Sequence, residues 1–179
     1  MHPRELICDA VVANLTNRTS AGTRVEAFRI DTYQDSELPA IAVYTQDEQV
    51  DPNSSSTAPR KLTRNVKAEI AATVAHSDAF PAWRAMNAIA EEIEAVMDVD
   101  RFLGGTAAGS VLESTEISFP TPSADPLLGI IVLTYSVTYQ TTPATGTLDD
   151  FLRAGTTTKF AGARDDNAPT DVISVRETP

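Results

Sequence analysis

Hydrophobic and polar positions alternate most regularly along residues 61–75, KLTRNVKAEIAATVA. One set of alternate positions is apolar from Leu62 to Val74, apart from Arg64, and the other set is polar apart from Ala71 and the final Ala75. This period of two is typical of a long strand in an antiparallel sheet with one covered and one solvent-exposed face. The polar positions are Lys61, Thr63, Asn65, Lys67, Glu69 and Thr73.

Four other segments have the pattern of strands. Residues 24–30, RVEAFRI, predict a short strand with a bulge where the alternation changes phase. Residues 39–45, PAIAVYT, place Ile41, Val43 and Thr45 on one face and Ala40, Ala42 and Tyr44 on the other. Residues 110–119 place Val111, Ile117 and Phe119 in phase. Residues 127–141 are apolar on both faces in their first half, which predicts a strand covered by helices on one side and by another layer or subunit on the other.

Two segments have the spacing of amphipathic helices. Residues 3–17 begin with Pro3, which suits a first helical turn, and carry apolar side chains every fourth residue. Residues 77–100 begin at Ser77 or Asp78 as the cap and bury one apolar stripe. The stripe consists of Met86, Ile89, Ala90, Ile93, Val96 and Met97. We expect Trp83, the only tryptophan, to be a core or hinge anchor, because an aromatic ring buries a large area.

The order of these elements, α-β-β-β-α-β-β, predicts an α+β domain over residues 1–141. Its mostly antiparallel sheet of four or five strands would carry both helices on one face. A polar loop at 46–60 is long enough to be functional. Residues 142–179 carry few apolar side chains, so we expect a C-terminal tail without a core of its own, with two helical turns at 147–155 and a short strand at 171–175.

Charge and composition exclude several classes of function. The chain has 14 Lys and Arg against 25 Asp and Glu, and its net charge of −11 disfavours binding along a DNA backbone. The same charge is compatible with a surface that DNA passes without binding. The longest apolar run, near residue 130, is too short to cross a bilayer, and residues 1–6 do not have the pattern of a secretory signal. The single cysteine, Cys8, is expected to be a small buried residue.

No arrangement of residues predicts catalysis, a cofactor site or a metal site. The glycine-rich segment 104–110 lacks the Lys-Ser/Thr of a phosphate-binding loop and is interpreted as a helix-to-strand turn. The two histidines have no zinc-ligand spacing, and His76 is expected at the surface. Adjacent carboxylates, such as Asp47 and Glu48, are expected to be solvated rather than paired in a pocket. We therefore expect a protein that is not an enzyme.

The ordered segments nevertheless resemble a known family. The segments LPAIAVYTQDEQ, RNVKAEIAATVA, MNAIAEEIEAVMDVD and LTYSVTYQT follow one another along the chain. This set resembles the tail terminator, or tail completion, proteins of long-tailed, lambda-like bacteriophages. That family has the same order of motifs: L/F-P-A-x-A-V-Y, an alternating strand, an amphipathic helix ending near an acidic turn, and T-Y-x-V-T-Y. The resemblance covers about residues 4–141 and does not extend to the tail at 142–179.

The resemblance implies a structural protein of the virion. Members of the family form a hexameric ring on the head-proximal end of the tail tube. The ring ends tube polymerisation and presents a surface to the head–tail connector. The expected partners are other copies of the chain, the tail tube protein and the connector protein, with DNA only as passing cargo and assembly in the host cytoplasm.

We expect subunits to meet along the polar face of the strand at 61–75, through Thr63, Asn65, Lys67 and Glu69. The loop from Asp51 to Arg60 would reach a neighbour or the tube, and Arg60, Lys61 and Arg64 would face acidic partners. Two alternatives remain open. One is a head-completion or neck adaptor protein of the same particle, and the other is a small enzyme whose site is not recognised.

Overall fold

The computed structural model describes residues 2–29, 31, 33–52, 61–120 and 126–142, together with the backbone of two strands at 153–156 and 171–174. The chain divides into two compact units, Met1–Pro143 and Ala144–Pro179. The expected loop at 46–60 begins later than predicted, because residues 46–50 continue the strand that starts at Ala40, and its residues 53–60, Arg60 included, lie outside the described residues.

The first unit is an α+β domain, as the sequence predicts. Its five-stranded sheet has the order β1-β2-β3-β5-β4, and all neighbours except β1 and β2 are antiparallel. The elements are α1 (Pro3–Leu15), β1 (Val25–Ala27), β2 (Ala40–Val50), β3 (Leu62–His76), α2 (Ala79–Val99), β4 (Gly109–Ser118) and β5 (Leu127–Thr141), with 3₁₀ turns η1 (Asp35–Glu37) and η2 (Leu103–Gly105).

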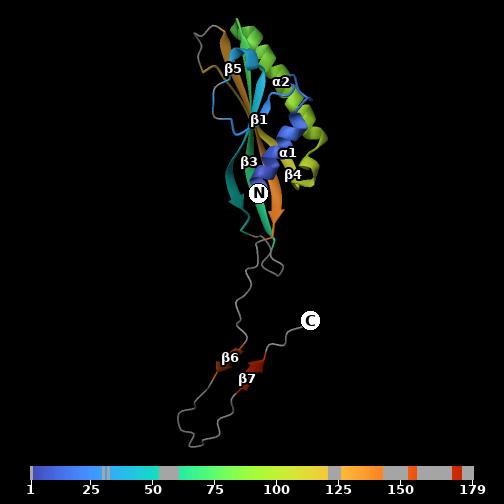
Figure 1. The fold of residues 1–179 in the computed structure, drawn as a ribbon, viewed down its shortest axis with the longest axis vertical. Coiled ribbons are helices and arrows are strands. Elements are labelled where there is room, and N and C mark those ends of the chain that lie inside the picture. The colour runs from blue at the N-terminus through green and yellow to red at the C-terminus, as the bar shows by residue number, and fades with distance from the viewer. Residues whose placement is uncertain are drawn as a thin grey trace, which may run out of the picture. The chain divides into compact units, whose positions relative to one another are not determined.

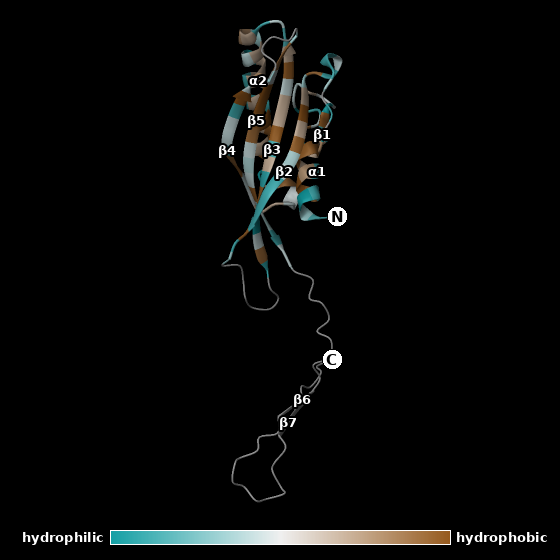
Figure 2. Cartoon of the chain, turned by 90° about the vertical axis from the view of Figure 1, so that its left-hand side faces the viewer, coloured by the Kyte–Doolittle hydropathy of each residue, from teal (hydrophilic) through white to brown (hydrophobic). Residues whose placement is uncertain are grey.

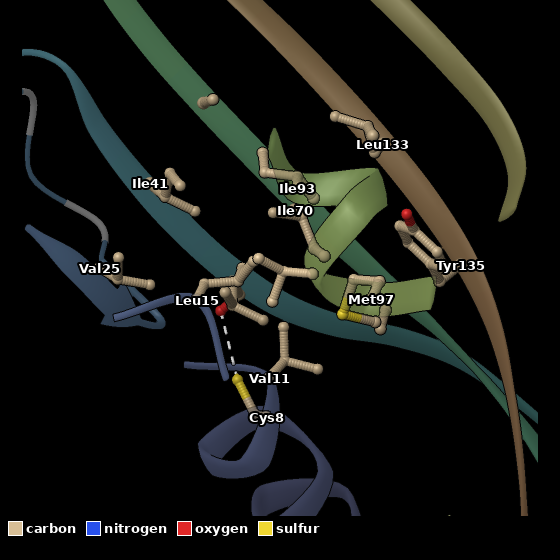
Figure 3. Close-up of a cluster of buried hydrophobic side chains, with 14 of the residues drawn as sticks. Cys8, Val11, Leu15, Val25, Ile41, Ile70, Ile93, Met97, Leu133 and Tyr135 are labelled. Atoms are coloured by element: carbon tan, nitrogen blue, oxygen red, sulfur yellow. Dashed lines mark hydrogen bonds between the residues drawn. The ribbon is translucent and has the colours of Figure 1, made fainter. Parts of the chain in front are cut away.

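Both helices pack on one side of the sheet (Figure 1). α1 contacts β1 and β2, whereas α2 contacts β3 and β5. Their apolar stripes meet the sheet in one core, part of which Figure 3 shows. The whole predicted stripe of α2 is buried, and Cys8 is buried with its thiol donating to the Val43 carbonyl. The helices thus cover the inner face of the sheet, and no helix of the described chain covers the outer face.

The register assigns each strand residue to a face. β3 and β5 pair along their full length, from Leu62 opposite Thr141 to His76 opposite Leu127. Ile70, Leu133 and Val43 point inward with the rest of their alternate sets. Ala40, Ala42 and Tyr44 point outward, as predicted.

Two strands differ from the alternation expected of them. β1 is shorter than 24–30 and has no bulge, because Phe28 adopts a φ of 53° and ends it. β4 contains a bulge between Leu112 and Ser114. Val111 therefore faces outward opposite Ser136, whereas Ile117 faces inward opposite Ile131, so the prediction that they share a face is wrong.

The second unit contains a two-stranded antiparallel sheet of β6 (Arg153–Thr156) and β7 (Asp171–Ser174). The predicted strand at 171–175 corresponds to β7. Helical turns were expected over 147–155, and this prediction is wrong for 153–155, which belong to β6. The remainder of that segment lies outside the described residues.

Candidate functional site

The lower part of the outer face, toward the start of β3, carries the polar residues predicted at the interface. Thr63, Asn65, Lys67 and Glu69 all point away from the helices, as their register against β5 requires. Lys67 and Asn65 are exposed, whereas Thr63 and Glu69 are half-buried. Cross-strand hydrogen bonds order this surface: Gln46 donates to Glu69 at 2.7 Å, and Ser136 donates to Asn65 at 2.8 Å. The surface is therefore a preorganised polar ladder.

The upper part of the same face is apolar. Toward the end of β3, the outward positions of β3 and β5 carry a set that we call the apolar patch, consisting of Ala71, Ala75, Leu128, Ile130 and Val132. All five residues are half-buried. Figure 2 views the sheet with the helices behind it, and apolar bands lie along the upper parts of β3 and β5. This patch is the part of the sheet for which the sequence predicts a second cover, and no helix of the described residues packs on it.

A third part of the outer face is covered by the chain itself. Ala40 and Ala42 point outward but are 0% and 2% exposed. Here the segment after β1 packs on the sheet: the Tyr44 hydroxyl donates to the Arg29 carbonyl at 2.6 Å, and the Arg29 guanidinium lies 4.2 Å from the centre of the Tyr33 ring. An adjacent copy is therefore not needed to cover Ala40 and Ala42. Their small side chains allow close packing, and a segment of the same chain packs there.

The bulge in β2 creates an ion cluster on the inner face. The register shifts between Gln46 and Glu48, and Asp47 adopts a φ of 23°. Glu48 consequently points inward, where its carboxylate accepts from Arg64 and pairs with Arg4 of α1 at 3.1 Å. Glu48 has a side-chain exposure of only 10%, so the expectation that the Asp47–Glu48 pair is solvated is wrong for Glu48.

Electrostatics stabilise the ionised form of Glu48. Burial alone would raise the pKa of Glu48, but the hydrogen bond from Arg64 and the positive charges of Arg64 and Arg4 outweigh burial and lower it. The Tyr139 hydroxyl also faces the carboxylate and contributes to this lowering, at a geometry outside that of a regular hydrogen bond. Arg64 is thus engaged within its own chain and is not free for an acidic partner, contrary to the sequence-based expectation.

A shallow hollow of about 290 Å³ lies beside this cluster, at the start of β3. Its lining brings together four of the predicted interface residues, Asp51, Thr63, Arg64 and Asn65. The backbone of Asp51 donates to the Thr63 carbonyl at 2.9 Å, which fixes the end of β2 against β3. Lys61 is exposed just before β3, whereas Lys67 and Glu69 lie farther along the strand, outside the hollow.

The most exposed large side chains near the start of α2 form a surface that the sequence did not predict. Phe80 and Trp83 are 65% and 46% exposed, and their rings stack with centroids 6.0 Å apart. The Arg84 guanidinium lies 5.5 Å from the centre of the Phe80 ring. We call these three residues the aromatic ridge. The expectation that Trp83 anchors the core is wrong: its position borders the buried stripe, but its ring is 46% exposed and stacks on Phe80, which lies on the outward side of the helix with Arg84.

The described residues do not suggest a metal site or a membrane span. No group of three or more His, Cys, Asp or Glu side chains in the described ranges is placed to hold a metal ion. None of the described helices combines the length and the apolar character needed to cross a membrane. In comparisons with known proteins, no family model and no curated protein matches the chain.

Proposed function

We propose that the chain is a structural virion protein, a tail terminator that forms a homo-hexameric ring on the head-proximal end of a phage tail tube. In this role it ends tube polymerisation and offers a surface to the head–tail connector protein. The observation that carries the proposal is the part of the outer face formed by the polar ladder and the apolar patch, a long surface on which no described helix packs. Such a face on a soluble chain is a natural contact for other subunits.

The order of the elements supports the same proposal. The four segments that carry the resemblance lie on β2, β3, α2 and β5, so each motif occupies a regular element of the kind the family's pattern implies. The net charge of −11 suits a ring through which DNA passes, because a negative surface repels the phosphate backbone.

Deleting the gene in the phage or prophage that encodes the chain tests the proposal. A tail terminator predicts tails of abnormal and variable length in electron micrographs, because nothing stops the tube from growing. Tails of normal length beside unjoined heads would contradict the proposal and favour a neck adaptor of the same particle.

Complementation then tests the polar ladder. The variant Lys67→Glu reverses an exposed charge on the outer face and should restore normal tail length less well than the unmodified chain. Arg18→Glu makes the same charge change at an exposed position after α1 and serves as the matched control. Arg64→Glu is unsuitable because it would break the ion cluster with Glu48.

A further inference from the structure

We propose that the aromatic ridge of one copy of this chain packs on the apolar patch of the next copy, in a repeated head-to-tail contact. Each surface is therefore occupied by a second copy of the chain. The proposal rests on the proposed function only for the closure of the contacts into a ring. The contact itself is argued from the positions, chemistry and charges of the two surfaces.

The two surfaces lie on opposite sides of the domain. Phe80 and Arg84 occupy the face of α2 that points away from the sheet, and Trp83 lies at the edge of that face with its ring stacked on Phe80. The apolar patch lies on the outer face, beyond the sheet from α2. A ridge on one side and an apolar patch on the other side allow copies to stack side by side, each using both surfaces.

The two surfaces also lie at the same end of the sheet. β3 ends at His76, and α2 starts at Ala79 and runs back along the sheet (Figure 1). The first turns of α2 therefore lie level with Ala75 and Leu128, which pair at the same end of the strands. At about 1.5 Å per helical residue and 3.3 Å per strand residue, the whole helix spans roughly the length of ten strand residues. Neighbouring copies can therefore meet without a large shift along the strands.

Charge is complementary between the two surfaces. Arg84 gives the ridge a positive charge, and Glu116 lies exposed on the outward side of β4, opposite Val132 of the apolar patch. Farther along, the exposed face of α2 becomes acidic at Glu91 and Glu94, and the outer face carries Lys67. The ion pairs found among the described residues involve none of these charges. They are thus available to a neighbouring copy.

The size and composition of the ridge suit an interface. A tryptophan, a phenylalanine and an arginine are the kinds of residue that contribute most to binding between proteins. An aromatic side chain buries about 150–250 Å² when fully covered, and Phe80 and Trp83 still expose 65% and 46% of their surface, so the ridge can supply a substantial share of the roughly 800 Å² per partner of a stable contact. Because the surfaces differ, the contact is heterologous, and repetition gives a ring if the rotation closes.

Sedimentation of the full-length chain tests this contact up to about 1 mM, a range that reaches weak association. The unmodified chain should form oligomers. A ridge variant, Phe80→Ala with Trp83→Ala, and a patch variant, Val132→Lys, should each be monomeric. Val99→Ser with Phe102→Ser removes two similarly exposed apolar side chains, at the last residue of α2 and just after it, and this control should associate like the unmodified chain.

Mixing the two variants separates a head-to-tail contact from a symmetric one. The ridge variant keeps an intact patch and the patch variant keeps an intact ridge, so an equimolar mixture should give one-to-one dimers and nothing larger. A symmetric contact between two ridges or two patches would give no such mixed dimer. An unmodified chain that stays monomeric at about 1 mM, or a mixture that stays monomeric, overturns the proposal.

Charge exchange gives a second test at exposed positions. Arg84→Glu or Glu116→Arg alone should weaken association at least several-fold, and the double variant should recover it, because each copy then presents the exchanged charges to its neighbour. Double variants no better than the singles would contradict the pairing. These readouts use the purified chain alone. The head-to-tail contact can therefore be disproved while the tail-length experiment supports the proposed function, or the reverse.

Discussion

Arg64 and Glu48 meet on the helix-covered face of the sheet although Glu48 follows a surface carboxylate in the sequence. Their contact depends on the bulge at Asp47, which turns Glu48 inward and brings it between β3 and α1. One extra residue in β2 thus joins the first helix to the lower end of the sheet through a single carboxylate.

Glu48→Gln should lower the free energy of unfolding by about 2 kcal/mol at neutral pH, because the amide cannot pair with two guanidinium groups. The pKa of Glu48 is lowered in the folded chain, so its stabilisation is complete above the unfolded pKa of about 4.3. It is lost as the pH falls through the folded value. Denaturant titrations should therefore show the difference between the two chains shrinking below about pH 4.

Asp47→Asn is the matched control for this prediction. Asp47 is exposed, lies next to Glu48, and adopts a backbone conformation that asparagine tolerates. It should change stability by less than about 0.5 kcal/mol. A Glu48→Gln difference that stays constant down to pH 3 would show that the carboxylate charge is not the source of the effect.

Gly129→Ala should reveal how closely α2 approaches β5. A Cβ at Gly129 would lie 2.8 Å from Met86 Sδ and 3.0 Å from Met86 Cε, in a fully buried part of the core. We expect a loss of about 1–2 kcal/mol, moderated by the flexibility of the methionine. In a background of Met86→Ala the same substitution should cost much less, and calorimetric unfolding of all four chains measures this coupling. Equal costs in both backgrounds would mean that Met86 does not set the limit.

Cys8 should be nearly inert in the folded chain. Its side chain is buried, and burial raises its pKa to about 11, with a smaller contribution from Asp9. The thiolate is the reactive form, so its fraction at pH 8 is about one in a thousand. A disulfide reagent should react at least 100-fold more slowly with the native chain than with the chain in denaturant. Fast stoichiometric reaction without denaturant would show that this part of α1 opens readily.

The sequence predicts the long elements well because their hydrophobic periods are regular. β5 has the predicted bounds, and the buried stripe of α2 is the predicted one, since each pattern extends over many residues. The polar ladder was also predictable: Lys67 and its outward neighbours follow directly from the alternation along β3. The period of two in hydrophobicity is therefore enough to identify the outer face as a candidate interaction surface.

The bulges and the exposed aromatic side chains were not predictable in the same way. A bulge moves Val111 and Glu48 to the opposite face, and it depends on how a strand pairs with its neighbour rather than on its own pattern. Trp83 was assigned to the core by residue type. Its spacing, three residues before Met86 and seven before Ala90, places it at the edge of the buried stripe, so helical position alone does not tell whether its ring is buried or exposed.

Tyr44→Phe should loosen the segment that covers Ala40 and Ala42 on the outer face. The substitution removes the hydrogen bond to the Arg29 carbonyl but keeps the edge contact between rings 28 and 44. We expect a loss of about 1 kcal/mol and faster hydrogen exchange at the Glu37 and Leu38 amides, with exchange in β5 unchanged.

Tyr33→Phe provides the matched control because the buried Tyr33 hydroxyl has no hydrogen-bond partner in the described chain. Removing it costs no hydrogen bond, so stability should stay within about 0.5 kcal/mol and exchange at Glu37 should not change. If the two variants behave alike, the Tyr44 hydrogen bond does not hold this cover. The segment after β1 would then leave the outer face of β2 readily. That part of the face would be as accessible as the part at β5, and a neighbouring copy could contact Ala42.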